Sequence, residues 1–253
     1  MSTDTTAAVA AREPELLGQI VVAIGGSAGI GLETARRARA EGAEVILTGR
    51  NPERLKRAAA EVGARGTAAF DATDPAALDR FFDGLPAQID HVMVTGPGPY
   101  YAPLAELDRD QARQDFEDHQ WLAMALAQHA VGRVRPGGTL IFMGGTGGRS
   151  RGPGLSMIAA ATAAMPALIA NLAVEIAPIR INLIAPGFVD TPLSASLLGD
   201  DLDARREELR STLPIGRVVG PEDVAALATH LMSNTALTGA TYDIDGGQQF
   251  VSA

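Results

Sequence analysis

Short apolar runs alternate with helical segments along most of the chain, and this rhythm constrains the fold more than any other feature. The runs include "QIVVAIGG" at 19–26, "AEVILTGR" at 43–50, "DHVMVTGPG" at 90–98 and "RINLIAPG" at 180–187. Continuously apolar strands separated by helices are typical of a parallel sheet covered on both faces. The sequence therefore predicts a single α/β domain: a Rossmann-like, doubly wound parallel sheet of about seven strands with helices on both faces.

Two segments depart from this rhythm. Residues 1–18 have neither a cationic start nor an apolar core, so we expect a flexible N-terminal arm ahead of a domain at 19–253. The segment 193–212, "LSASLLGDDLDARREELRST", predicts a polar helical insertion. We interpret it as a lid over the carboxyl edge of the sheet, and a plain surface excursion is the alternative.

The composition narrows the classes of ligand. The sequence contains no cysteine, which excludes disulfides and thiolate metal sites, and we predict no metal site. A net charge of -9 argues against nucleic acid as a partner, because binding to phosphate backbones needs clustered cations. No apolar run is judged long enough to span a membrane. These features favour a soluble, cytoplasmic protein that acts on a small-molecule substrate.

A glycine-rich turn follows the first predicted strand. Gly25, Gly29 and Gly31 lie between the strand "IVVAI" and the helix expected to begin near residue 31. Glycines at this point let the backbone turn sharply and approach a pyrophosphate, whose charge then meets the free amides at the start of the helix. The strand, turn and helix together predict a dinucleotide site.

Four motifs resemble those of the short-chain dehydrogenase/reductase family from about residue 19 to 251. They are "IGGSAGIG" at 24–31, with Ile24 in place of a threonine, "FDATD" at 70–74, "INLIAPGFVDTPL" at 181–193 and "GATYDIDGG" at 239–247. The resemblance implies a nicotinamide dinucleotide. The residues expected to hold it are Gly25, Ser27, Gly29, Ile30, Gly31, Arg50, Asn51, Asp71, Ala72, Thr95, Gly96, Pro97, Pro186, Gly187, Val189 and Thr191.

Arg50 predicts which dinucleotide is bound. It stands at the exit of the second predicted strand, where an acidic residue grips a free 2′-hydroxyl and a cation is needed for a 2′-phosphate. A guanidinium can pair bidentately with that phosphate or stack on the adenine. We therefore expect NADP(H), and a solvated loop charge is the alternative interpretation of Arg50.

The resemblance fails at the reacting centre. The family uses a tyrosine, a lysine four residues later, a serine about 13 residues before the tyrosine, and an asparagine in the preceding helix. In this chain Ile158, Thr162 and Gly145 occupy the tyrosine, lysine and serine positions, and His119 occupies that of the asparagine, or Gln120 if the register slips by one. No shift in alignment restores the pair, because no tyrosine lies between residues 101 and 242 and Lys56 is the only lysine.

Three residues are candidates for the missing acid: His119, Tyr100 and Thr146. Histidine donates protons near neutral pH, although a packing role is the simpler interpretation. Tyr100 follows the fourth predicted strand, where ligands of such sheets collect, and can equally form an aromatic wall. Thr146 adjoins the lost serine. Arg149 and Arg151 are placed towards the rim, either for a substrate anion or simply solvated.

The sequence supports two main hypotheses. The first is an atypical NADP(H)-dependent short-chain oxidoreductase that acts on a small carbonyl or alcohol without the tyrosine–lysine pair. The second is a non-catalytic NADP(H)-binding sensor or inactive partner subunit, and another chemistry on the same scaffold is a third possibility. Family members commonly pair through two long helices, here expected at about 110–133 and 154–177, so we predict a homotetramer or homodimer.

Overall fold

A computed structural model describes residues 13–96, 98–149 and 151–251 and contains a seven-stranded sheet in the order β3-β2-β1-β4-β5-β6-β7. Every neighbouring pair of strands is parallel, which confirms the predicted doubly wound fold. The strands are β1 (Ile20–Ile24), β2 (Glu44–Gly49), β3 (Gly66–Ala69), β4 (Ile89–Val94), β5 (Val134–Met143), β6 (Arg180–Pro186) and β7 (Thr241–Ile244). The helices are α1 (Gly29–Ala40), α2 (Pro52–Val62), α3 (Pro75–Asp83), α4 (Arg109–Ala130), α5 (Ser156–Glu175), α6 (Pro192–Leu198), α7 (Leu202–Thr212) and α8 (Pro221–Ser233).

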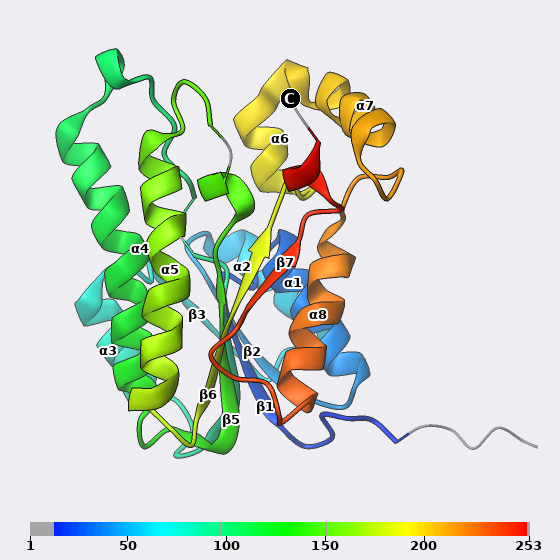
Figure 1. The fold of residues 1–253 in the computed structure, drawn as a ribbon. Helices are drawn as coiled ribbons and strands as arrows, with labels where there is room; N and C mark the ends of the chain where they lie inside the picture. Colours follow the sequence, from blue (N-terminus) through cyan, green and yellow to red (C-terminus); the bar gives the residue numbers. More distant parts are fainter. Residues whose placement is uncertain (1–12, 97, 150, 252–253) are drawn as a thin grey trace, which may run out of the picture.

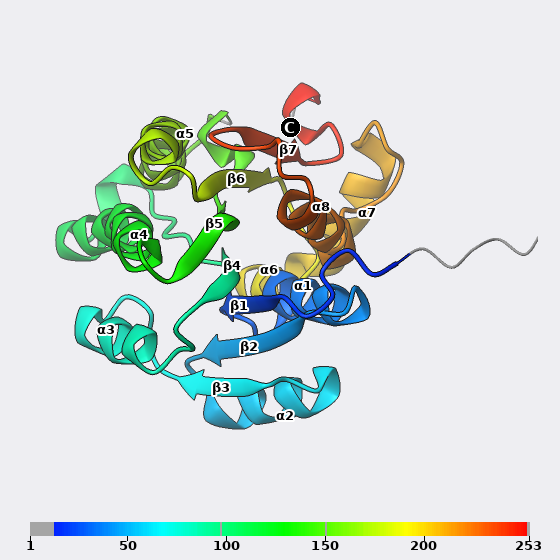
Figure 2. The same cartoon turned by 90° about the horizontal axis from the view of Figure 1, so that it is seen from below.

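The helices form two layers, one on each face of the sheet. Helices α3, α4 and α5 cover one face, and α1, α2 and α8 cover the other (Figure 2). Strand residues alternate between two hydrophobic cores: Val22 and Val92 pack with the first layer, and Val21 and Met93 pack with the second. Both faces of the central strands are therefore buried, which explains why these runs are apolar throughout.

Helices α2 and α3 begin with the same local signal. The side chains of Asn51 and Asp74 accept hydrogen bonds from backbone amides of the first turn, and a proline follows each of them. Such caps satisfy amides that have no partner within the helix, and proline there loses no helical hydrogen bond. These local signals fix the points where the chain leaves β2 and turns back after β3.

Helix α5 is long and apolar enough, by length and composition alone, to cross a membrane. The expectation that no such run exists is therefore wrong. In the folded domain α5 packs against β6 and α4, with Ile158, Met165 and Ile169 buried in or beside the core. Packing against the sheet accounts for the apolar character of its inner face, whereas Val174 on the same helix is 79% exposed.

Residues 13–18 fall within the expected N-terminal arm but are packed against the domain, and residues 1–12 lie outside the described part of the chain. Leu16 is fully buried, and its backbone amide donates to the Glu41 carbonyl at 3.0 Å. The Gly18 amide donates to the Gly42 carbonyl at 3.1 Å. Residues 13–18 thus pack against the end of α1, because the apolar Leu16 side chain gains a place in the core.

Helices α6 and α7 lie beyond the carboxyl ends of the strands (Figure 1). Arg206 of α7 reaches back to Asp190, which follows β6, with Nε–Oδ2 and Nη2–Oδ1 distances of 2.9 and 2.7 Å. Such a bidentate pair fixes geometry as well as adding attraction. It ties the far end of the insertion to the exit of β6.

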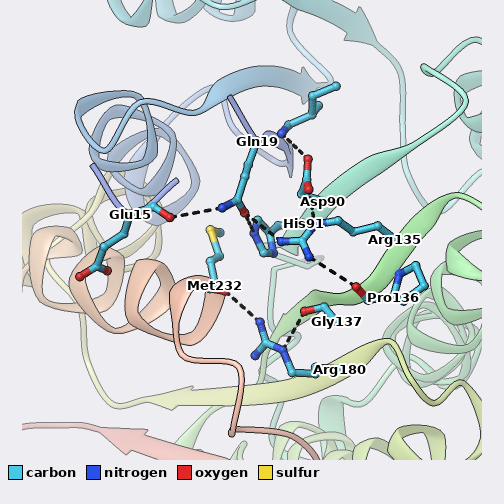
Figure 3. Close-up of polar contacts among 10 residues, drawn as sticks. Glu15, Gln19, Asp90, His91, Arg135, Pro136, Gly137, Arg180 and Met232 are labelled. Atoms are coloured by element: carbon cyan, nitrogen blue, oxygen red, sulfur yellow. Dashed lines mark hydrogen bonds and ion pairs between the residues drawn. The ribbon is translucent and has the colours of Figure 1, made fainter. Parts of the chain in front are cut away.

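A buried polar cluster lies at the opposite, amino edge of the sheet (Figure 3). His91 is fully buried on β4, and its Nε2 lies 2.6 Å from Oε1 of Gln19. That oxygen also accepts from Arg135, which pairs with Asp90. Arg180 of β6 donates to several backbone carbonyls at the end of α8, including that of Met232 at 2.8 Å. The cluster joins β1, β4, β5 and β6 away from the dinucleotide motifs.

Candidate functional site

The glycine turn between β1 and α1 forms a cradle that leaves no room for a side chain at Gly25 or Gly31. Gly25 and Gly29 have φ values of +84° and +53°, which favour glycine. A Cβ on Gly31 would overlap the Gly25 carbonyl oxygen. Ala28 precedes α1 and has a methyl side chain that cannot cap the helix. The first amides of α1 are therefore left to bind an anion, and the geometry fits a pyrophosphate.

Other segments that carry the family motifs converge on this turn. A Cβ on Gly29 would lie 3.5 Å from Cβ of Thr191, which follows β6. A Cβ on Gly25 would overlap the hydroxyl of Thr95, which follows β4. Ser27 lies against Gly49 at the end of β2. The fold thus gathers the exits of β1, β2, β4 and β6 at one edge, where open α/β sheets bind ligands.

Arg50 extends from the end of β2 into solvent. Its side chain is 77% exposed, and Nη1 lies 4.0 Å from Oδ2 of Asp71, which follows β3. The other carboxylate oxygen of Asp71 accepts from the Thr73 amide at 3.1 Å and hydroxyl at 2.9 Å. Asn51 uses its side-chain oxygen to accept from the Arg54 amide at 2.9 Å. Arg50 and Asp71 therefore stand together, and Asn51 has a structural role as the cap of α2.

The segment after β6 is held by the C-terminal turn and by its own cap. The Phe188 amide donates to Oε1 of Gln248 at 2.8 Å, and a Cβ on Gly187 would clash with that same side chain. Thr191 caps α6 by accepting from the Ser194 amide at 3.4 Å. The remaining residues predicted to hold the dinucleotide lie at this edge, except Pro97, which falls outside the described residues; they are Ile30, Ala72, Gly96, Pro186 and Val189.

The three positions that the sequence aligned with the family's serine, tyrosine and lysine lie close together. A Cβ on Gly145 would stand 3.6 Å from Cγ2 of Thr162. Ile158 lies one turn before Thr162 on α5, and both side chains are buried. The Thr162 hydroxyl donates to the Ile158 carbonyl at 2.7 Å, so its proton is already used. Gly145 has no side chain, and neither Ile158 nor Thr162 offers an acid to a substrate.

Of the three candidates for the acid, His119 lines a cavity at the carboxyl edge. The cavity has a volume of about 20 Å³, which is enough for one water molecule. The ring Nδ1 lies 2.7 Å from the Asp115 carbonyl oxygen. The cavity lining consists of Val94, Gly96, His119, Leu122, Ala123, Phe142, Met143 and Met165.

Tyr100 and Thr146 are placed differently. The Tyr100 hydroxyl accepts from the Asp108 amide at 3.2 Å, just before α4 begins. Thr146 is buried in the short 3-10 helix Thr146–Arg149 that follows Gly145. Tyr100 therefore helps to fix the loop before α4, and Thr146 lies directly after Gly145.

Arg149 is already paired within the protein. Its guanidinium contacts the Asp243 carboxylate of β7, with Nη2–Oδ1 at 2.8 Å, and also contacts Gln249. The hydrogen bonds from Arg149 hold the pKa of Asp243 below its usual range. Arg149 therefore bridges β7 and the C-terminal turn, in contrast to the expected role of awaiting a substrate anion. Arg151 is exposed.

Sequence analysis missed Asp115. This residue of α4 is 6% exposed, and its Oδ2 has no hydrogen-bond partner among the described residues. Burial raises its pKa, and the nearby His119 opposes that rise. Its Oδ2 lies 3.8 Å from Nδ1 of His119. The signal was available, because residues four apart on a helix share a face.

Known proteins resemble the chain over most of its length. The family model described as "Enoyl-(Acyl carrier protein) reductase" matches residues 25–249. The 4-formylbenzenesulfonate dehydrogenase of Comamonas testosteroni is 32% identical, with 91% of this chain and 97% of that protein covered. The MalC reductase/Diels-Alderase from Malbranchea aurantiaca superposes with a TM-score of 0.87 at 25% identity, covering 94% of this chain and 99% of that one. A small-chain dehydrogenase in complex with NADPH superposes with a TM-score of 0.78 at 27% identity, covering 92% and 99%.

Proposed function

Because the chain belongs to the short-chain dehydrogenase/reductase family, we propose that it is an NADP(H)-dependent oxidoreductase for a small carbonyl or alcohol substrate. We further propose that it is an atypical member, which works without the family's tyrosine–lysine pair. Ile158 and Thr162 stand at those two positions. Membership of the family supports a nicotinamide cofactor, and the finer assignments depend on this chain's own residues.

One observation carries the proposal: the glycine cradle faces Thr191 across the carboxyl edge. Gly29 and Thr191 are 162 positions apart in the numbering, yet a Cβ on Gly29 would stand 3.5 Å from that of Thr191. The glycine turn would bind the pyrophosphate, and the segment from Pro186 to Thr191 would hold the nicotinamide end.

The preference for NADP(H) over NAD(H) rests on Arg50. Its exposed guanidinium stands at the exit of β2, where the adenosine ribose of a dinucleotide lies in this fold. Nη1 lies 4.0 Å from Oδ2 of Asp71, which follows β3. A cation there attracts a 2′-phosphate. The related dehydrogenase solved with NADPH supports the same assignment.

His119 is the acid in this proposal. When bound, the reduced nicotinamide would supply a hydride to the substrate's carbonyl carbon. His119 would then give a proton to the oxygen, since it lines the cavity beside Gly96 and Met143. Tyr100 and Thr146 would orient the substrate from the loop before α4 and from the end of β5.

The proposal also includes a lid, an oligomeric interface and a cytoplasmic location. Residues 193–212 act as a lid, anchored by Arg206 on Asp190. Helices α4 and α5 form the interface of a homodimer or homotetramer, because Trp121 and Val174 are 63% and 79% exposed there. The cysteine-free sequence fits the cytoplasm, which is a reducing compartment.

Titration with NADPH and with NADH, followed by nicotinamide fluorescence, tests the cofactor assignment. We expect NADPH to bind at least about 10-fold more tightly, and Arg50→Ala to remove most of that preference, since 1.4 kcal/mol of phosphate pairing is worth a factor of 10. Arg54→Ala, another exposed arginine nearby on α2, is the matched control. Equal affinity for the two cofactors would refute the role of Arg50, and binding of neither would refute the oxidoreductase.

The dry reacting centre favours one other function, a non-catalytic NADP(H)-binding sensor or inactive partner subunit. The two functions differ in turnover. The oxidoreductase predicts slow oxidation of NADPH with a panel of aldehydes and ketones, and a fall of 100-fold or more in His119→Gln. Tight NADPH binding with no turnover on any carbonyl would favour the sensor.

A further inference from the structure

Asp115 is a buried carboxyl group that the fold does not satisfy. It lies on the inner side of α4 with 6% of its side chain exposed, and Oδ2 has no hydrogen-bond partner among the described residues. Burying an ionised or unpaired carboxyl group costs free energy unless a partner offsets it. His119, one turn later on the same helix, places Nδ1 3.8 Å from that oxygen.

The backbone of Asp115 also fixes the protonation of the His119 ring. The distance from Nδ1 to the Asp115 carbonyl oxygen is 2.7 Å, which is a hydrogen bond. A carbonyl oxygen can only accept, so Nδ1 carries the proton. Nε2 is then the nitrogen left for the cavity that His119 lines. The carbonyl oxygen and the carboxylate of Asp115 therefore both lie near Nδ1 of His119.

We propose that Asp115 is a positioning residue for His119: its carbonyl fixes the Nδ1-protonated ring, and its buried carboxylate stabilises the positive charge that the ring carries before Nε2 gives up a proton. This inference rests on the proposed function, because it assigns a partner to the acid of that site.

The step balances with the groups already named. When bound, the reduced nicotinamide would supply the hydride, and with it the two electrons that reduce the substrate's carbonyl group, and would itself be oxidised. The Nε2–H bond of His119 would break as the O–H bond of the alcohol forms. The ring would return to its neutral form with Nδ1 still bonded to the Asp115 carbonyl. A proton from water recharges the ring for the next turnover.

The surroundings leave Asp115 as the charged group best placed to act on the ring. From the sheet, Val94, Gly96, Phe142 and Met143 line the cavity, and α5 presents Met165. None of these side chains titrates. On α4 itself, Asp118 accepts a hydrogen bond from Gln114 at 2.6 Å and adds to the rise in the pKa of Asp115 that burial causes.

Titration of Asp115 by carboxyl carbon NMR tests the pairing in the absence of substrate and cofactor. We expect the pKa of Asp115 to rise further in His119→Gln, because the positive charge that opposes the effect of burial is removed. An unchanged titration of Asp115 would overturn the pairing, even if the protein binds NADPH and turns over.

Turnover of the NADPH-loaded protein tests whether Asp115 assists proton transfer from His119. We expect Asp115→Asn to lower kcat about 10- to 100-fold, with KM and NADPH affinity unchanged. Asp110→Asn, at a 93% exposed position on the same helix, is the silent control. The double variant Asp115→Asn with His119→Gln should be no slower than His119→Gln alone, since both residues act through one ring. Additive losses, or an equal effect of Asp110→Asn, would overturn the proposal. Failure of His119→Gln to slow turnover would instead refute the acid of the proposed function.

Discussion

His91 should make the folded protein lose stability as the pH falls below neutrality. Its ring is fully buried on β4, with Nε2 bonded to Gln19 and Nδ1 without a hydrogen-bond partner among the described residues. Burial lowers its pKa from 6.5 to about 3; the carboxylate of Asp90 opposes this effect, and Arg135 and Arg180 add to it. The folded protein therefore keeps the ring neutral over a range in which the unfolded chain would protonate it.

The size of this loss follows from the two pKa values of His91. Between pH 6.5 and about 3 the unfolded state binds more protons than the folded state, so acid favours unfolding. The stabilisation is present above pH 6.5 and is lost as the pH falls towards 3. Each pH unit within this range is worth about 1.4 kcal/mol. Acidification from pH 7 to pH 5 should therefore lower the free energy of unfolding by about 2 kcal/mol through His91 alone.

Urea denaturation at pH 7 and pH 5 measures this difference when wild type is compared with His91→Gln. Glutamine can still donate to the Gln19 oxygen but cannot take up a proton. We expect the variant to be less stable at pH 7 and its loss on acidification to be smaller by about 2 kcal/mol. His230→Gln, at an exposed histidine on α8, is the matched control and should retain the full wild-type loss.

Two results would refute this reasoning. One is an equal loss of stability on acidification in wild type and His91→Gln. The other is a His91 ring resonance that titrates between pH 7 and pH 5 in the folded wild-type protein, which NMR detects even if the variant does not fold.

Three further predictions concern the cradle, the reacting centre and the core. Gly31→Ala should weaken NADPH binding at least about 10-fold with an unchanged circular dichroism spectrum, because the added methyl overlaps the Gly25 carbonyl oxygen; unchanged affinity would contradict the cradle. Ile158→Tyr with Thr162→Lys should create reductase activity on simple ketones, whereas silence in an NADPH-binding double variant would count against a productive nicotinamide position. Leu126→Ala, at a fully buried position on α4, should cost about 2–5 kcal/mol in urea denaturation, and a cost below 1 kcal/mol would contradict its core position.

The order of strands and helices could be predicted because each element carries its own local signal. The apolar runs at β1, β4 and β6 mark strands buried on both faces, and turn residues separate them from helices. Right-handed crossovers then leave few ways to assemble a parallel sheet. The packing of Leu16 against the end of α1 could not be predicted, because a single apolar residue carries too weak a pattern.

The family motifs predicted which residues hold the dinucleotide. Only the fold shows which other residues each of them contacts. Nothing local shows that Gly29 meets Thr191, or that Arg149 is paired with Asp243, since these contacts form between distant segments. The pairing of Asp115 with His119 is different. Helical spacing makes it visible in the sequence, but only the packing of α4 shows that the carboxylate is buried.

The sequence by itself therefore determined the α/β class and the glycine turn, because each depends on residue types at short spacing. The tertiary structure alone decided which charges are already neutralised, which histidine lines a cavity and which histidine stays neutral in the core. Burial and long-range contacts set those properties, and they exist only after the sheet and its two helical layers have packed.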